Sequence, residues 1–374
     1  METQNQLTPT LEVSGSRQFV SWLHEQALSV AFSTYQTGKL FLVGAKQDGR
    51  LSVFERTFER CMGLCATADS QTLWMSSLYQ LWRFENALPV GERAPRGYDR
   101  LYVPQLGYTT GDIDLHDIGL AQAQPAPRPD DSSAYAGISL EPAERTMPIF
   151  VNTLFSCIAA PSGTHSFRPI WKPSFISRLA AEDRCHLNGL AMEDGRARYV
   201  TAVSTSDVHE GWREHRRNGG VVVDVLSGEI VCRHLSMPHS PRVHGGVLYV
   251  LNSGTGEFGI VEPKSGGFQP ICFCPGYARG LALYGGFAII GLSTCRENRT
   301  FSGLELDDAL ASRNVQARCG LLVIDLKRGD VVHSLTLTGV VRELYDVAVL
   351  PGVRMPSALG FKTEEIRRTI TIGE

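Results

Sequence analysis

The chain has 374 residues, 43% of them hydrophobic, with 37 Gly and 19 Pro, which suffices for one large core or two small ones. A net charge of −3 provides no basic field, so we expect no nucleic-acid or membrane partner. No apolar run reaches the roughly 18 residues that span a bilayer, and the polar N-terminus lacks a secretion signal. Nine cysteines without regular spacing predict reduced, mostly buried thiols in a cytoplasmic protein.

The chain begins with a predicted polar arm, residues 1–16, followed by a short helix. Between Arg17 and Leu28, apolar side chains recur at roughly helical spacing, which indicates that helix. We therefore divide the chain into an arm with a helix (1–28), a single β domain (29–352) and a surface tail (353–374).

Six stretches within the β domain share one pattern, in which a polar or cysteine-containing start leads into a short apolar strand. In one of them, Cys185 to Asn188 precede the strand Gly189 to Met192, and an Asp-Gly turn leads to a second strand. The six stretches start near Cys61, His116, His186, His239, Ala278 and Tyr345. Divergent repeats of strands and turns predict an all-β fold, a six-bladed β-propeller.

The two ends of the β domain complement each other. The strands predicted at Ser29–Thr34, Lys39–Gly44 and Arg50–Phe58 lack a strand with a polar start, whereas Tyr345–Leu350 has that start and lacks partners. Joining them makes one four-stranded blade and closes the ring without an open edge. Alternatively, Ser29–Thr34 is itself an innermost strand, and the ring then has seven blades.

Three long connections interrupt the repeats. Residues 121–145 are rich in Pro, Ala, Asp and Ser, which indicates an ordered loop or a flexible lid. Residues 296–318 have helical character around Leu304–Ser312. The polar loop Asp207–Arg213 contains Trp212, which either belongs to solvent-exposed structure or caps a pocket and contacts substrate.

Three of the polar starts carry a histidine at an equivalent position: His116, His186 and His239. The first strand of a propeller blade lies nearest the axis, so these side chains should converge on one small volume. Neutral imidazole is the commonest protein ligand for metals, and three of them leave positions open for water or substrate. We predict one divalent metal ion there: iron, zinc or calcium. Alternatively, each histidine only bonds the backbone of a neighbouring strand.

Four further residues at these starts complete the predicted site. Asn188 and Asp346 are candidate catalytic residues that orient the metal ligands or a bound water molecule. Arg242 and Arg279 suit an anionic substrate group such as a carboxylate, which accepts two parallel hydrogen bonds from a guanidinium. The alternative is that the two arginines pair only with Asp117 or Asp346.

Several of these motifs together resemble a bacterial family of conserved proteins known only as a domain of unknown function. They are Asp183–Ala191, Gly211–Arg213, Leu235–Arg242, Leu251–Glu257 and Pro275–Leu281. The resemblance covers most of residues 20–352, with Met237–Arg242 as its most specific part, and it implies no established activity. More distantly, His186–Ala191 followed by Asp194-Gly195 is similar to strands of gluconolactonase-like and regucalcin-like propellers. That similarity implies six blades and one divalent metal ion on the axis.

Two functional hypotheses follow. The first is a metal-dependent enzyme, a hydrolase or an oxygenase, that acts on a small anionic molecule at the propeller axis; the metal would activate water or bind oxygen. The second is a non-catalytic propeller that binds a peptide or a partner protein on its rim, through Trp171, Trp212 and the long loops. Metal content separates the two, since a catalytic metal site should retain about one ion per chain.

Overall fold

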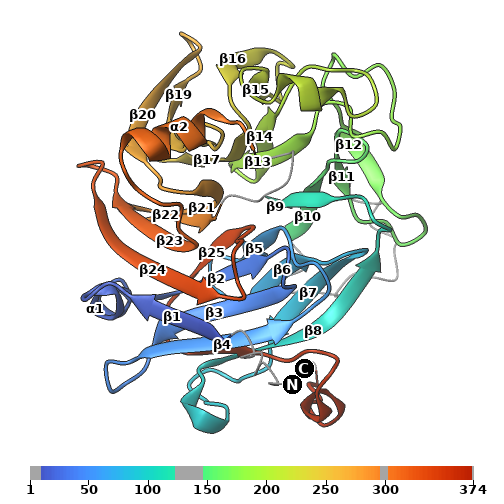
Figure 1. Cartoon of the computed structure of the whole chain (residues 1–374). Helices are drawn as coiled ribbons and strands as arrows, with labels where there is room; N and C mark the ends of the chain where they lie inside the picture. The colour runs from blue at the N-terminus through green and yellow to red at the C-terminus, as the bar shows by residue number, and fades with distance from the viewer. Residues whose placement is uncertain (1–9, 123–145, 295–301, 373–374) are drawn as a thin grey trace, which may run out of the picture.

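The computed structural model describes residues 10–122, 146–294 and 302–372. Six sheets stand around a central axis and form a closed ring (Figure 1). Two short helices, α1 (Phe19–Glu25) and α2 (Glu305–Ser312), lie outside the sheets. The protein is therefore an all-β, six-bladed propeller, as the repeat pattern predicts.

Strands from both ends of the chain form the blade that closes the ring. It contains, from the axis outward, β25 (Val347–Pro351), β2 (Leu28–Thr34), β3 (Lys39–Ala45) and β4 (Leu51–Thr57). In the antiparallel pair β25–β2, Leu28 lies opposite Pro351 and Phe32 opposite Val347. The predicted pairing of the two chain ends is confirmed. The seven-blade alternative is wrong, because β25 rather than β2 is the innermost strand.

The other five blades follow one another along the chain, each beginning at the axis. The second blade contains β5 (Leu64–Ala66), β6 (Thr72–Ser76), β7 (Gln80–Asn86), β8 (Arg100–Thr109) and β26 (Pro356–Ala358). The third contains β9 (Leu115–Gln122), β10 (Thr146–Asn152), β11 (Cys157–Ala160) and β12 (Arg168–Trp171). The fourth contains β13 (Leu187–Glu193), β14 (Arg196–Ala202), β15 (Gly220–Asp224) and β16 (Ile230–Leu235). The fifth contains β17 (Pro238–His244), β18 (Val247–Asn252), β19 (Glu257–Glu262) and β20 (Gly267–Phe273). The sixth contains β21 (Tyr277–Tyr284), β22 (Phe287–Ser293), β23 (Gly320–Asp325), β24 (Val331–Gly339) and β1 (Leu11–Gly15).

Hydrophobic patterning changes from the inner to the outer strands of a blade. Every residue of β2 is buried, because neighbouring blades cover both faces of an inner strand. In the outer strand β4, buried or half-buried residues alternate with exposed ones over most of its length. Apolar β-branched and aromatic side chains such as Val30 and Phe32 suit the first environment.

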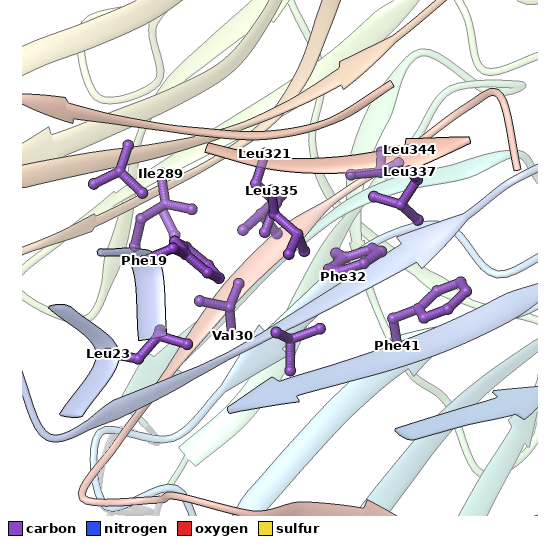
Figure 2. Packing of buried hydrophobic residues seen from close by; sticks show 14 of the residues in the cluster. Phe19, Leu23, Val30, Phe32, Phe41, Ile289, Leu321, Leu335, Leu337 and Leu344 are labelled. Atoms are coloured by element: carbon purple, nitrogen blue, oxygen red, sulfur yellow. The ribbon is translucent and has the colours of Figure 1, made fainter. Parts of the chain in front are cut away.

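The core at the closure lies between the first and the sixth blade (Figure 2). Phe32 and Phe41 stack with ring centroids 4.9 Å apart, and they face side chains of β22 to β24 such as Leu335 and Leu337. Helix α1, where the sequence predicted a helix, contributes Phe19, Trp22 and Leu23 to this cluster. Apolar burial at this seam therefore holds together segments from opposite ends of the chain.

Both chain ends differ from the sequence interpretation. Leu11–Gly15, expected in a loose arm, forms β1 and pairs antiparallel with β24. Pro356–Ala358, expected in a surface tail, is the buried strand β26 and pairs parallel with β8. The reason is the same at both places: the outer strand of a blade has an unpaired edge, and a fifth strand satisfies its backbone groups.

The long connections are described in part. Helix α2 lies where residues 304–312 were expected to be helical. The loop around Trp212 contains the 3₁₀ helix Gly211–His215, and two more such turns are Pro95–Gly97 and Glu364–Arg367. Most of the predicted lid, residues 123–145, lies outside the described residues.

Substitution of Gly189 should destabilise the ring. A Cβ atom there would lie 3.0 Å from Ser240 N in the next blade and closer still to Pro241 and Thr201. Overpacking of this kind typically costs about 1–3 kcal/mol. We expect Gly189→Ala to lower the free energy of unfolding by that amount, measured by chemical denaturation.

The matched control is Gly163→Ala, because a Cβ atom at Gly163 has no neighbour within 4 Å. Equal stability of the two variants would contradict the close approach of β13 and β17.

Candidate functional site

Hydroxyl side chains join successive blades near the axis. At the end of the second strand of a blade, a Ser or Thr hydroxyl donates to a backbone carbonyl at the start of the next blade. The pairs are Ser33 with Met62, Ser76 with Leu115, Thr153 with Leu187, Ser253 with Ala278 and Ser293 with Leu344. The fourth blade differs, since β14 is followed by Val203, which packs with Met237 and Trp212.

A cluster of charged side chains, Asp117, Arg242 and Asp346, ties the blades together on the axis. Arg242 Nη1 donates to Asp117 Oδ2 at 2.8 Å, and its Nη2 lies 3.6 Å from Asp346 Oδ1. Asp117 also accepts from the backbone N–H of Leu190, and Asp346 from that of Leu64. Burial and the Asp117 carboxylate raise the pKa of Asp346 to about 7.

This cluster corrects the role expected for Arg242. Its guanidinium also donates to the carbonyls of Leu281 and Leu190, so its hydrogen bonds are made within the protein. Arg242 does not line the open axial pocket. Arg242 therefore makes the ion pairs with Asp117 and Asp346 that the sequence offered as the alternative to binding substrate.

The axial pocket lies above this cluster and has a volume of about 150 Å³. It is lined by Tyr35, Asp114, His116, Asp183, His186, Trp212, Arg213, Met237, Arg279 and Tyr345. Of the predicted site residues, the pocket therefore brings together His116, His186, Trp212 and Arg279. A smaller cavity beneath it is bordered by Asn188, His239 and Asp346, and by three residues shared with the pocket.

One wall of the pocket is built from Asp183, His186 and Trp212. His186 Nδ1 lies 2.9 Å from Asp183 Oδ2, and Trp212 Nε1 donates to the same oxygen at 2.8 Å. The imidazole stacks on the indole with ring centroids 4.2 Å apart. Asp183 and His186 both have positive φ, 42° and 50°, which costs energy for residues other than glycine and recurs at functional sites.

Two buried imidazoles near the axis have low proton affinity: His116, which lines the pocket, and His239, which borders the smaller cavity. Burial, together with the charges of His186 and Arg279, lowers the pKa of His116 well below its ordinary value. Burial and Arg279 do the same to the pKa of His239. Both rings are therefore neutral near pH 7.

Arg279 lies among these rings. Its Nη2 is 3.1 Å from His239 Nε2, and its guanidinium carbon is 4.3 Å from the centroid of the Tyr345 ring. Arg279 is 7% exposed, and within the described residues it forms no ion pair with a carboxylate. Gly280 permits this placement, because a Cβ atom there would lie 2.7 Å from Val347 N.

Three buried polar atoms around the lower cavity lack a hydrogen-bond partner among the described residues. They are Arg279 Nε, Tyr345 Oη and Asn188 Nδ2. Asn188 Oδ1 accepts from the Thr201 hydroxyl at 2.8 Å, so only its amide nitrogen is unused. Unpartnered buried groups of this kind are rare in folded proteins, and these three concentrate where the sequence predicted a site.

The three histidines do not fit one metal ion in this arrangement. His116 and His186 have ring centroids 5.0 Å apart, but the Nε2 atom of His239 accepts from Arg279. A guanidinium among the ligands would also repel a cation. No group of three or more His, Cys, Asp or Glu side chains within the described part of the chain is arranged to hold a metal. The metal site stays a prediction.

Sequence reasoning assigned no role to Asp183, Asp114 or Tyr35, which also line the pocket. The sequence did contain a signal for Asp183, because this carboxylate precedes His186 by three residues at the same polar strand start and could have been predicted to pair with it. Tyr35 follows β2, the second strand of its blade, whereas the predicted site was built from the starts of the innermost strands. Tyr345 was recognised as a strand start but was given no function.

The cysteines contribute to the core. Eight of them are described, and all eight are unpaired. Burial raises the pKa of Cys61 and Cys185 to about 12, which argues against a nucleophilic role near the axis. Across the described ranges, no helix combines the length and the apolar character needed to cross a membrane. The cytoplasmic location stays a prediction.

Fold and site define a six-bladed propeller with a polar pocket on its axis. The chain belongs to the family described as "Domain of unknown function (DUF4915)", whose sequence pattern matches residues 17–359. The prediction of a family known only as a domain of unknown function is thus confirmed, and no activity comes with the family. A search of curated proteins gave no match.

Solved structures share the fold at low sequence identity. The chain is similar to one in the crystal structure of a nidogen/laminin complex, with 12% identity, a TM-score of 0.50, and coverage of 87% of this chain and 99% of that one. A protein of unknown function from Bacteroides caccae is 11% identical with a TM-score of 0.44, over 86% of this chain and 98% of that one. At 12% identity, the similarity to the chain of the nidogen/laminin complex concerns the fold alone.

The neutral histidines predict a loss of stability in acid. Below the ordinary histidine pKa of about 6.5, the unfolded chain binds protons that folded His116 and His239 do not, so stability falls as the pH falls. Each of these two histidines lowers the free energy of unfolding by up to about 1.4 kcal/mol per pH unit of acidification. Asp346 has the opposite effect, because its raised pKa lets the folded protein bind a proton that the unfolded chain does not, and it offsets about one histidine. We expect a net loss of about 1 kcal/mol between pH 6 and pH 5, the contribution of one uncompensated histidine.

The test is urea denaturation of the wild type and of His116→Gln at several pH values in this range. The variant loses one of the two histidine contributions, so its stability should depend less steeply on pH. An unchanged slope would mean that the His116 imidazole is not held neutral by the fold.

Proposed function

We propose that the axial pocket binds a small anionic molecule, such as a carboxylate, and that the Asp183–His186 pair performs acid–base chemistry on it. The observation that carries the proposal is Arg279, a buried cation without a carboxylate partner within the described residues. The proposal keeps the substrate class expected from the sequence and replaces the metal by protein side chains.

The electrostatics of Arg279 favour an anion. A buried charge is costly unless a counter-charge and hydrogen bonds compensate for it. Arg242 has that compensation, because Asp117 and Asp346 lie beside it. Among the described residues, Arg279 contacts only the neutral His239 and the face of Tyr345, and its Nε has no hydrogen-bond partner there. A bound carboxylate would supply the missing charge through two parallel hydrogen bonds.

The acid–base role follows from the geometry of His186. Because Nδ1 faces the Asp183 carboxylate at 2.9 Å, Nδ1 carries the hydrogen and Nε2 is the basic atom. The carboxylate both fixes the orientation of the ring and stabilises the imidazolium that forms when Nε2 accepts a proton. Trp212 Nε1 fixes the carboxylate in turn. Such a pair is a recurrent device for proton transfer.

The hypothesis of binding at the rim gains no support from Trp212. This side chain is 2% exposed and packs against His186, so it offers no surface to a peptide or protein. It belongs to the wall of the pocket, in keeping with the expected contact to substrate. Binding at the rim stays a prediction that would depend on Trp171 and the loops.

Arg279→Met should weaken the binding of anions. The substitution keeps an unbranched, flexible side chain and removes its charge and hydrogen-bond donors. A hydrogen bond to a charged group contributes about 1.5–3 kcal/mol, or roughly 10- to 150-fold in Kd. We expect calorimetric titration of the wild type with acetate, lactate and gluconate to detect binding of at least one, and the variant to lose it by that factor.

The control is Arg168→Met, because Arg168 is exposed on β12 at the outer side of the third blade. It should bind like the wild type. Undiminished binding by Arg279→Met would refute the proposed site.

Elemental analysis distinguishes this proposal from metal-dependent catalysis. A metal held by three imidazoles requires Arg279 to leave His239 Nε2. We expect protein purified with and without oxygen to contain far less than one metal ion per chain. Retention of about one zinc or iron ion per chain would support the metal-dependent enzyme instead.

A further inference from the structure

We infer that the ligand of the axial pocket is a small hydroxy acid, with its carboxylate on Arg279 and its hydroxyl donating to an imidazole nitrogen of His186 or His116. This inference rests on the proposed function and specifies its substrate class.

The hydrogen-bond partners determine the tautomers of all three histidines. His116 Nδ1 lies 2.9 Å from the carbonyl oxygen of Asp114, and His239 Nδ1 lies 2.8 Å from that of Met237. A carbonyl oxygen can only accept, so Nδ1 must donate. His186 Nδ1 donates to Asp183 in the same way. When Nδ1 carries the hydrogen of a neutral imidazole, Nε2 has a lone pair and accepts hydrogen bonds.

One of the three acceptors is already used. His239 Nε2 accepts from Arg279, whereas no donor reaches the Nε2 atoms of His116 and His186 from the rest of the described chain. These two rings lie edge to face, with centroids 5.0 Å apart. The pocket thus combines one cationic donor with two neighbouring imidazole nitrogens that no donor in the described chain occupies. A complementary ligand carries an anionic group and a hydrogen-bond donor.

A hydroxyl fits these acceptors better than an ammonium group. A buried ammonium needs a carboxylate partner, and both carboxylates of the pocket are engaged. Asp183 accepts from His186 and Trp212, while Asp114 lies 3.6 Å from Arg60. A hydroxyl can donate to a neutral imidazole without a counter-charge.

The volume restricts the size of the ligand. About 150 Å³ corresponds to about five water molecules at roughly 30 Å³ each. An acid of three or four carbon atoms fills that space, with Trp212 and Tyr345 as aromatic walls.

Matched ligand pairs test the hydroxyl directly on the full-length wild type. The pairs are lactate and propionate, 3-hydroxybutyrate and butyrate, and malate and succinate, with alanine added to test an ammonium group. One well-formed hydrogen bond corresponds to up to about tenfold in affinity. We expect the hydroxy acid of at least one pair to bind about tenfold more tightly than its partner and more tightly than alanine.

A variant checks which atom accepts. His186→Phe keeps a ring over Trp212 and removes Nε2, so the preference for hydroxyl should fall to about twofold or less while binding of the plain carboxylate persists. The same preference in this variant and in His116→Phe would overturn the inference.

The outcomes separate the two proposals. Equal binding of both members of every pair, with loss in Arg279→Met, overturns the hydroxy acid and leaves the anion site standing. Tighter binding of alanine overturns it in favour of an amino acid. No binding of any of these anions overturns both proposals.

Discussion

The ring depends on a charged contact at its centre. Arg242, from the fifth blade, reaches the carboxylates of Asp117 in the third and Asp346 in the first, and it donates to carbonyl groups of the fourth and sixth. The carboxylates in turn accept from backbone N–H groups of the fourth and second blades. One guanidinium and two carboxylates therefore involve all six blades, where the backbone groups at the strand starts would otherwise lack partners.

This central contact also explains why the two arginines differ in function. Asp117 and Asp346 both face Arg242, so within the described chain they leave no carboxylate for Arg279 on the neighbouring strand. The charge of Arg279 is instead turned toward neutral imidazoles and the pocket. A fully compensated cation serves stability, whereas an uncompensated one beside a cavity serves binding.

The pocket wall forms at the one described junction between blades where no Ser or Thr at the end of the second strand donates to the next blade. Elsewhere a Ser or Thr hydroxyl joins the end of the second strand to the next blade, but at the fourth blade Val203 packs with Trp212 and Met237. This apolar contact holds the loop with Gly211–His215 against the axis, so that Trp212 supports both Asp183 and His186. The irregular junction thus provides the acid–base pair with its supporting contacts.

Local sequence alone determined the repeat. Apolar strands, Asp-Gly turns and polar starts are short-range signals, and they sufficed to predict the fold class, the closure by Tyr345–Leu350 and the axial placement of His116, His186 and Arg279. They did not predict which outer edges would accept a fifth strand, because β1 and β26 satisfy edges that exist only once the blades have formed.

Tertiary structure alone decided the chemistry of each polar start. From residue type and position at a strand start, His239 was predicted to be a metal ligand and Arg242 a substrate contact. The role of a charged or imidazole group, however, depends on which groups lie within about 4 Å of it in three dimensions. Arg242 meets two carboxylates from distant blades, and His239 meets Arg279. The sequence by itself determined where polar groups gather on the axis; the packing of the blades decided which of them neutralise one another and which remain available for a ligand.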